Sequence, residues 1–155
     1  MRLTQAFNRV LLVGIDSSPF IYFVEKHPKY FDLMKTILSL NAKGDFDSIG
    51  SVLLLTELLT QPLKLENEYF LAEYEDILKR AKGFKLVNVN SNIARKAAYL
   101  RATYNLRTPD ALHVATAIES GCDAFLTNDV GIKRVTELRI LLLDELELDS
   151  PDEDP

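Results

Sequence analysis

The order of apolar and polar residues along the chain alternates between two patterns. One is a short apolar or alternating run of strand length, and the other is an apolar stripe with helical spacing. Strands are predicted at residues 10–15, 46–51, 84–89, 124–127 and 139–143. Helices are predicted from residue 17, over 30–42, 52–60, 66–81 and 92–104, from 108 to a stop at Gly121, and in a short segment ending at 137. The alternation predicts an α/β fold, a three-layer sandwich with a mostly parallel central sheet flanked by helices.

Capping and breaking residues set two of the expected helix boundaries. Thr108 is the expected N-cap of its helix, with Pro109 at the first position and Asp110 in the first turn. Pro62 is the expected end of the helix at 52–60, because proline lacks the backbone N–H that continues a helix. In parallel sheets ligands bind at the carboxyl ends of the strands, so the loops after the strands are the expected place for a site.

The composition is that of one globular domain. The chain has 155 residues, of which 47% are hydrophobic and 26% are charged. Its single cysteine excludes a disulfide within one chain and a cysteine-based zinc site, and it fits a reducing compartment. No apolar run approaches the roughly 18 residues of a membrane helix, and the run at 10–15 is too short for a signal peptide. We therefore expect a cytoplasmic protein.

The negative charge is concentrated at the C-terminal end. Of the 18 basic and 23 acidic residues, seven acids and no lysine or arginine lie at residues 144–155, so residues 1–143 carry a formal +2. We expect a domain at residues 1–148 and an acidic, disordered tail at residues 149–155. The tail is either a solubilising end or a mimic of RNA that tempers the active groove. The overall acidity therefore does not count against a nucleic-acid substrate.

Four acidic residues stand alone in apolar stretches of the sequence. They are Asp16, Glu57, Asp110 and Asp129. A carboxylate in such a stretch is expected to be at least partly buried, and a buried charge needs a partner. Two of the four follow predicted strands, one lies in the first turn of a helix, and one lies on the helix after the second strand. All four can therefore converge on one rim of the sheet.

Most of these acids also have a simpler interpretation. Asp16 could cap the next helix, Asp110 could act on the helix dipole, and Asp129 could be a turn residue. Glu57 is hardest to explain in this way, because an apolar helix has little use for a carboxylate. As a set, converging carboxylates repel one another unless a cation neutralises them. Oxygen ligands suit Mg²⁺ or Mn²⁺, which can activate water and stabilise charge on a phosphoryl group.

Longer segments around these acids resemble PIN-domain proteins. The segments are IDSSPFIYFVE at residues 15–25, TELLT at 56–60, TPDALHVATAIESGCDAFLTND at 108–129, and the closing strand. The resemblance runs from about Val10 to Leu143 and is strongest to the short VapC-type toxins of bacterial and archaeal toxin–antitoxin systems. It implies a parallel sheet flanked by helices and metal-dependent cleavage of RNA.

The resemblance also implies roles for individual residues. The catalytic, metal-binding acids would be Asp16, Glu57, Asp110 and Asp129, with Mg²⁺ or Mn²⁺ as the cofactor. Ser17 and Thr127 match supporting polar positions. After the last acid, the family often has an Asp-Phe pair where this chain has Val130-Gly131-Ile132, which leaves the shape of this loop open.

Basic residues near the acids are the expected contacts to RNA phosphates. These are Lys133, Arg134 and Arg107, and a merely solvated position is the alternative for each. His113 lies three residues after Asp110 and is either a general base or a buried supporting residue.

The leading hypothesis is a metal-dependent endoribonuclease, the toxin of a toxin–antitoxin pair. Its expected partners are an RNA substrate, an antitoxin protein and a second copy in a homodimer. The first alternative is a catalytically silent PIN-type protein that binds RNA or acts as a scaffold. The second is a receiver-like or phosphatase-like α/β domain, which the positions of Glu57 and Asp110 do not suit well.

Overall fold

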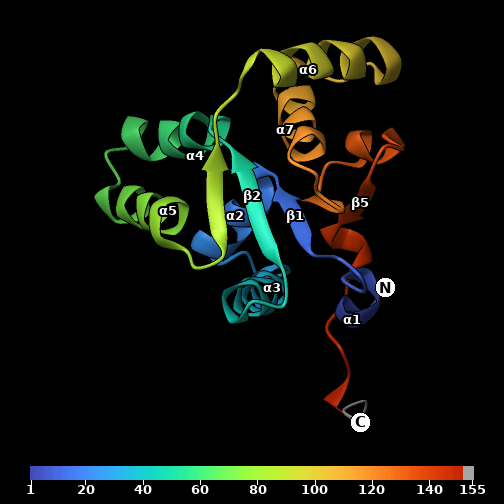
Figure 1. The fold of residues 1–155 in the computed structure, drawn as a ribbon. Helices are drawn as coiled ribbons and strands as arrows, with labels where there is room; N and C mark the ends of the chain where they lie inside the picture. The colour runs from blue at the N-terminus through green and yellow to red at the C-terminus, as the bar shows by residue number, and fades with distance from the viewer. Residues whose placement is uncertain (152–155) are drawn as a thin grey trace.

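The computed structural model describes residues 1–151, and its centre is a sheet of parallel strands (Figure 1). The strands lie in the order β3-β2-β1-β4-β5, and each neighbouring pair is parallel. They are β1 (Leu12–Ile15), β2 (Asp47–Ser51), β3 (Phe84–Val87), β4 (Ala124–Thr127) and β5 (Arg139–Leu142). The predicted three-layer α/β fold is therefore confirmed.

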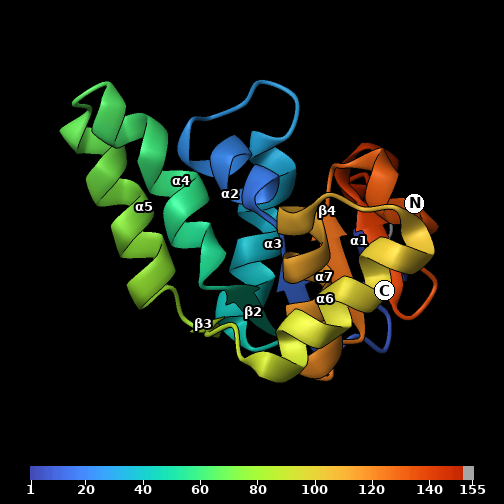
Figure 2. The same cartoon turned by 90° about the horizontal axis from the view of Figure 1, so that it is seen from above.

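Helices cover both faces of this sheet. They are α1 (Leu3–Ala6), α2 (Ser17–Val24), α3 (Phe31–Lys43), α4 (Leu53–Lys64), α5 (Glu68–Arg80), α6 (Ser91–Tyr104) and α7 (Thr108–Glu119), with 3₁₀ helices η1 (Val130–Arg134) and η2 (Leu143–Glu145). Figure 2 shows α6 and α7 on one side of the sheet and α2 to α5 on the other. Within residues 1–151, no helix has both the length and the apolar character needed to cross a membrane.

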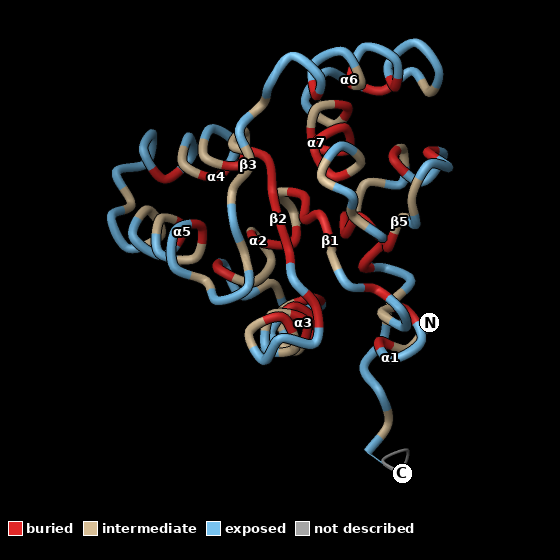
Figure 3. The backbone as a smooth tube through the Cα atoms, viewed as in Figure 1, coloured by how far each residue is buried: buried red, intermediate tan, exposed pale blue. Residues whose placement is uncertain are grey.

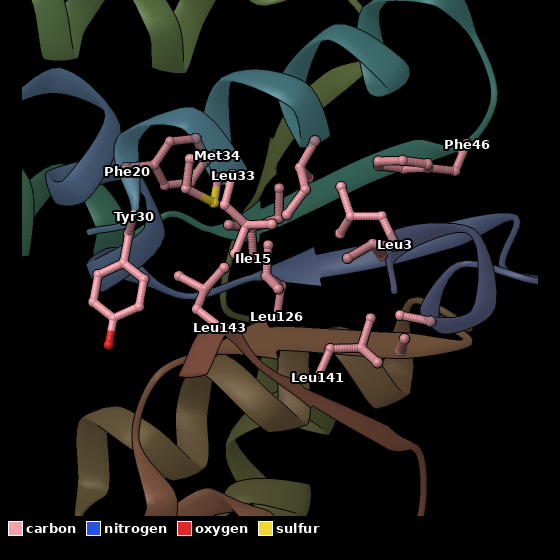
Figure 4. Packing of buried hydrophobic residues seen from close by; sticks show 14 of the residues in the cluster. Leu3, Ile15, Phe20, Tyr30, Leu33, Met34, Phe46, Leu126, Leu141 and Leu143 are labelled. Carbon is pink, nitrogen blue, oxygen red and sulfur yellow. The ribbon is translucent and has the colours of Figure 1, made fainter. Parts of the chain in front are cut away.

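Each face of the sheet buries its own apolar cluster. On one face, Ile15 and Leu126 pack with Phe20 of α2 and Met34 of α3 (Figure 4). On the other face, Phe125 belongs to a cluster with residues of α6 and α7. Successive residues of β4 thus point to opposite faces, and both faces are covered. This double burial explains why β1 and β4 are short apolar runs. Figure 3 shows that β2 is buried as well, although its sequence DSIGS is largely polar.

Helix α7 crosses β1 very closely at Gly14. A Cβ atom at this position would lie 2.7 Å from the Cβ atom of Ala117, which is too close for any side chain. Because α7 runs from Thr108 toward Glu119, its first turns lie nearer to the carboxyl end of β1 than Ala117 does. The contact therefore sets the N-terminal half of α7 beside Asp16, the residue that follows β1.

One expected helix end is wrong. Pro62 lies inside α4, which continues to Lys64, and the ring of Pro62 is buried. A proline in the last turn removes only the hydrogen bond of its own nitrogen. The next turn still closes, since the backbone N–H of Leu65 donates to the carbonyl oxygen of Gln61 at 3.0 Å.

The expected N-cap of α7 is also wrong by one residue. Arg107 has the extended backbone of an N-cap, and its carbonyl oxygen accepts the first helical hydrogen bond, from the N–H of Ala111 at 3.0 Å. Thr108 is therefore the first helical residue. The short helix expected after Asp129 is the 3₁₀ helix η1, which ends at Arg134.

The N-terminal segment lies alongside the C-terminal segment, a pairing that the sequence pattern did not predict. The N–H of Leu3 donates to the carbonyl oxygen of Glu147 at 3.1 Å, and the Thr4 hydroxyl donates to Asp149 Oδ1 at 2.8 Å. The division into a domain at residues 1–148 and a tail at 149–155 stays a prediction. Residues 152–155 lie outside the described part of the chain.

Candidate active site

Asp16 and Asp129 lie at the carboxyl ends of neighbouring strands. β1 and β4 pair directly, and the backbone N–H of Asp16 donates to the carbonyl oxygen of Leu126 at 3.0 Å. The buried hydroxyl of Thr127 donates to Asp16 Oδ2 at 2.7 Å and accepts the backbone N–H of Asp129 at 3.0 Å. Thr127 therefore joins the first acid to the loop that carries the last one.

Asp16 is a buried carboxylate, only 6% exposed. It caps α2, since its Oδ1 atom accepts the backbone N–H of Ser17 at 2.8 Å. Burial raises the pKa of Asp16 above its usual value, against the opposing effects of His113 and of the hydrogen bonds from Thr127 and Ser17. The capping interpretation of Asp16 is thus correct, but it does not account for the burial of a charge.

Glu57 and His113 form a pair between α4 and α7. His113 Nε2 and Glu57 Oε1 make a short hydrogen bond, and His113 Nε2 also lies 4.0 Å from Asp16 Oδ1. Burial lowers the pKa of His113, but the hydrogen bond to Glu57 and the charges of Asp16, Glu57 and Asp110 outweigh it, so this pKa lies above its usual value. The buried imidazole therefore bridges two of the predicted acids and favours its charged form.

Asp110 and Asp129 share a second cation, Arg107. Arg107 Nε donates to Asp110 Oδ2 at 3.0 Å, and Arg107 Nη2 lies 4.0 Å from Asp129 Oδ2. The Arg107 side chain is 80% exposed. The four carboxylates thus belong to one chain of contacts at the carboxyl edge of the sheet, connected through His113, Thr127 and Arg107.

The loop after Asp129 is a tight capped turn. Asp129 Oδ1 accepts the backbone N–H of Gly131 at 2.8 Å, which makes Asp129 the N-cap of η1. A Cβ atom at Gly131 would lie 3.1 Å from Asp129 Oδ1, so a glycine suits this approach of backbone to carboxylate. The Val130-Gly131-Ile132 segment, which the resemblance left open, therefore holds the last acid in place.

A groove of about 300 Å³ opens beside Asp110 and Asp129. It is lined by Asn105, Leu106, Arg107, Asp110, Asp129, Gly131 and Arg134. Two of the three predicted phosphate contacts, Arg107 and Arg134, thus line a groove that contains two of the acids. The third, Lys133, instead pairs with Glu145 of η2.

The donor set suits a hard divalent cation, although it is not preassembled as a cage. Within residues 1–151, no group of three or more His, Cys, Asp or Glu side chains is arranged to hold a metal ion directly. Carboxylate oxygens are nevertheless the ligands that Mg²⁺ and Mn²⁺ prefer, and Mg²⁺ commonly keeps several water ligands. The burial that raises the pKa of Asp16 would also be relieved by a nearby cation. Here Arg107 supplies positive charge to Asp110 and Asp129, and His113 lies against Asp16 and Glu57.

The PIN domain family model matches residues 13–138, a span that contains all four acids. The chain belongs to the PIN-domain family. Both the fold class and the resemblance drawn from the sequence segments are therefore confirmed, and the PIN domain of this chain extends over most of its length.

Solved structures with a similar fold come from toxin–antitoxin systems. One is VapBC2 from Rickettsia felis, bound to a DNA fragment from their promoter, with 20% identity, a TM-score of 0.70 and coverage of 85% of this chain and 98% of that chain. DNA-bound VapBC from Salmonella typhimurium has 18% identity, a TM-score of 0.68 and coverage of 86% and 98%. A toxin–antitoxin complex from Klebsiella pneumoniae has 20% identity, a TM-score of 0.61 and coverage of 84% and 99%. A search of curated proteins found no match.

Sequence reasoning placed the acids but missed their partners. It considered His113 only with Asp110, whereas the hydrogen bond is to Glu57. It treated Arg107 only as a phosphate contact, although an arginine three residues before an isolated acid is a usable signal for an ion pair. It also did not single out Asn128, whose side chain joins Tyr22 to the backbone of Asp144.

Proposed function

We propose that this PIN-domain protein is a divalent-metal-dependent endoribonuclease that hydrolyses RNA phosphodiester bonds. The observation that carries the proposal is the contact chain through His113, Thr127 and Arg107, which gathers four carboxylates around the buried Asp16. A buried carboxylate with a raised pKa is costly to a fold and is typical of a functional site. Membership of the PIN-domain family supports the same chemistry.

The acids divide the work between holding the cofactor and handling water. Asp16, Asp110 and Asp129 would hold one or two Mg²⁺ or Mn²⁺ ions, partly through water, after Arg107 moves away from its two acids. The bound cofactor would lower the pKa of a water molecule and offset charge on the phosphoryl group. Asp16 is fixed for this task by Thr127 and by the backbone of Ser17.

Glu57 and the basic residues would act on the water and on the substrate. The Glu57 side chain is 34% exposed and faces His113, so it can orient the attacking water and accept its proton while His113 holds the carboxylate in position. Arg107 and Arg134, which line the groove, would then contact the phosphates on either side of the scissile bond. Arg107 would exchange its carboxylate partners for a phosphate of the RNA.

The structural neighbours are toxin–antitoxin complexes, which supports an antitoxin as a partner. We propose that this protein is a toxin of the cytoplasm, held inactive by an antitoxin and paired as a homodimer. Coexpression with the product of a neighbouring open reading frame should yield a complex that cleaves RNA more slowly than the free protein. Size-exclusion chromatography with light scattering would give the mass of the free protein and of the complex.

The deciding experiment is RNA cleavage by the purified protein with Mg²⁺ or Mn²⁺. Asp16→Asn and Asp110→Asn should each abolish metal-dependent cleavage of mixed single-stranded RNA substrates, and EDTA should do the same for the wild type. Asp76→Asn is a matched control, because Asp76 lies on α5 in an exposed pair with Arg80 and has no part in the site.

The possible outcomes separate the hypotheses. Equal cleavage by the wild type and both site variants would overturn the ribonuclease proposal, since a contaminant would then be responsible. Cleavage that survives EDTA would overturn the metal mechanism alone. RNA binding without any metal-dependent product would favour the catalytically silent PIN-type protein instead.

A further inference from the structure

The acidic turn η2 lies directly against the loop that carries Asp129. The backbone N–H of Asp144 donates to Asn128 Oδ1 at 3.0 Å, and Asn128 immediately precedes Asp129. Leu143, at the start of η2, is buried in the apolar core and anchors the turn. Two acidic side chains, those of Asp144 and Glu145, are thereby placed at the rim of the candidate site.

Each of these two acids is paired with a lysine from a different segment. Lys29 Nζ, from the loop between α2 and α3, lies 2.8 Å from Asp144 Oδ1. Lys133 Nζ, from η1, makes a short contact with Glu145 Oε1. The lysine side chains are 66% and 50% exposed, respectively. Both lysines therefore point to solvent at the rim, with their charge balanced by a carboxylate of the same chain.

The loop that carries Lys29 is held in place by aromatic rings. The ring centroids of Tyr22 and Tyr30 lie 4.6 Å apart, and the ring of His27 lies 4.8 Å from each. His27 Nδ1 accepts the backbone N–H of Lys29 at 3.1 Å, and Asn128 Nδ2 donates to the Tyr22 hydroxyl at 3.3 Å. The position of Lys29 is thus tied, through Asn128, to the loop of Asp129.

Exposed ion pairs of this kind are easily exchanged. They contribute little to stability, because water screens the charges and two long side chains must be ordered. A phosphate offers a lysine the same anionic oxygens as a carboxylate does, and RNA presents these groups in series along its backbone. An RNA strand can therefore replace both acids at little cost, whereas two unpaired lysines would bind any polyanion.

We propose that Lys29 and Lys133 form a phosphate-binding subsite for single-stranded RNA, which Asp144 and Glu145 occupy until the RNA displaces them. Lys133 directly precedes Arg134 in η1, and Arg134 lines the groove beside Asp129, so the subsite would continue the path of the RNA strand beyond that groove. This proposal rests on the proposed ribonuclease function. It also gives the acidic C-terminal segment a role in tempering the affinity for RNA.

The test is the affinity for a single-stranded RNA oligonucleotide, measured in an Asp16→Asn background that does not cleave it. Adding Asp144→Asn and Glu145→Gln should tighten binding about 5-fold at physiological salt. The slope of log K against log salt should also become steeper, by about one. Adding Lys29→Gln and Lys133→Gln instead should weaken binding by a similar factor. The two double variants break the same two ion pairs. If these changes only disturbed the structure, both variants would shift the RNA affinity in the same direction.

Two further variants test whether the result is specific to these residues. Glu73→Gln with Asp76→Asn removes the same charge from exposed positions on α5 and should leave the affinity within about 2-fold of its background. In the Lys29→Gln and Lys133→Gln variant, replacing Asp144 and Glu145 as well should not change the RNA affinity further. The subsite proposal is wrong if the α5 control gains as much RNA affinity as the rim variant does. It is also wrong if the rim substitutions raise the affinity without the two lysines, or if they do not raise it at all.

Failure of the subsite can be told apart from failure of the proposed function. If the otherwise wild-type chain cleaves RNA but the rim variants bind like their background, only the subsite is wrong. If the protein neither binds nor cleaves RNA under any condition, the ribonuclease proposal is wrong and the subsite falls with it.

Discussion

The two halves of the candidate site differ in how their charges are held. In one half, Asp16 is buried beside His113, whose side chain is only 1% exposed. In the other half, Asp110 and Asp129 share Arg107, whose side chain is 80% exposed. The first half is built from the ends of β1 and α7 and from the buried Thr127, while the second lies at the open groove.

This difference separates a fixed part of the site from an exchangeable part. In the buried half, the carboxylate of Asp16 accepts hydrogen bonds from Thr127 and from the backbone of Ser17, so losing one of them leaves a desolvated charge. In the exposed half, the Arg107 side chain is open to water, so it can change partners at little cost to stability. A PIN-domain site of this kind can keep its central acid in place while its outer cation moves to a substrate.

The largest expected effect is that of replacing Asp16, which should change activity and stability differently. Asp16→Asn should lower the cleavage rate at least about 100-fold, because even groups that only support a metal site are worth roughly 10- to 100-fold. The free energy of unfolding in EDTA should not fall, since the substitution removes a charge whose pKa is raised by burial. Single-turnover cleavage and urea unfolding measure the two quantities. An activity loss that merely follows a loss of folded protein would contradict this interpretation.

The next effect concerns the hydroxyl of Thr127 in the buried half. Thr127→Val should lower the free energy of unfolding by about 2 kcal/mol, because it removes a hydrogen bond to a buried carboxylate. Thr116→Val is the matched control: the equally buried Thr116 hydroxyl donates only to the carbonyl oxygen of Leu112 in its own helix, at 2.7 Å. Urea denaturation of the two variants should show a clearly larger loss for Thr127→Val. Equal losses in the free energy of unfolding would show that the hydrogen bond from Thr127 to Asp16 stabilises the protein no more than the one within α7 does.

A smaller effect is expected from Arg107 in the exposed half. Arg107→Gln should leave the unfolding midpoint unchanged within error, because the guanidinium that it removes is open to solvent. It should weaken RNA binding and reduce the magnitude of the salt slope by about 0.7, which corresponds to one lost phosphate contact. Binding titrations at several salt concentrations check both points. A large drop in the unfolding midpoint would mean that the contacts of Arg107 stabilise the fold as strongly as those of the buried half.

The smallest effect is a pH dependence at the rim. The hydrogen bond and charge of Lys29, with the hydrogen bond of Tyr30, lower the pKa of Asp144, whereas burial raises the pKa of Asp16. The contribution of Asp144 to stability is therefore present above the ordinary aspartate pKa of about 3.9 and is lost as the pH falls through its lower value in the folded protein. Thermal unfolding of the wild type should thus lose slightly more stability between about pH 4 and pH 2 than Asp144→Asn does. Parallel curves for the two proteins would show that this pair contributes nothing measurable.

Much of the fold could be predicted because burial leaves a direct mark on the sequence. The run at 124–127 predicts β4 with its observed bounds, since a strand covered on both faces must be apolar throughout. The isolation of Asp16 in an apolar stretch likewise indicated its burial. The end of α4 was predicted less well, because Pro62 can be kept in a last turn when its ring is buried by tertiary packing.

The contacts around the acids could not be predicted in the same way. Glu57 and His113 are 56 residues apart, and Asp16 and Thr127 are 111 residues apart. Local spacing shows which face of a helix or which end of a strand a residue occupies. It does not show which two such ends meet. The pairing of Lys29 with Asp144, across 115 residues, escaped prediction for the same reason.

The sequence by itself determined that this protein is an α/β PIN domain with four carboxylates placed to converge on one rim. Periodicity and isolated charges depend on burial, and burial is a property that each segment carries locally. Only the tertiary structure decided which cation faces each acid, because those contacts arise where α7 crosses β1 at Gly14 and where η2 packs against the loop of Asp129. These packing contacts divide the rim into a buried half, which is held by the core, and an exposed half, which is open to exchange with a substrate.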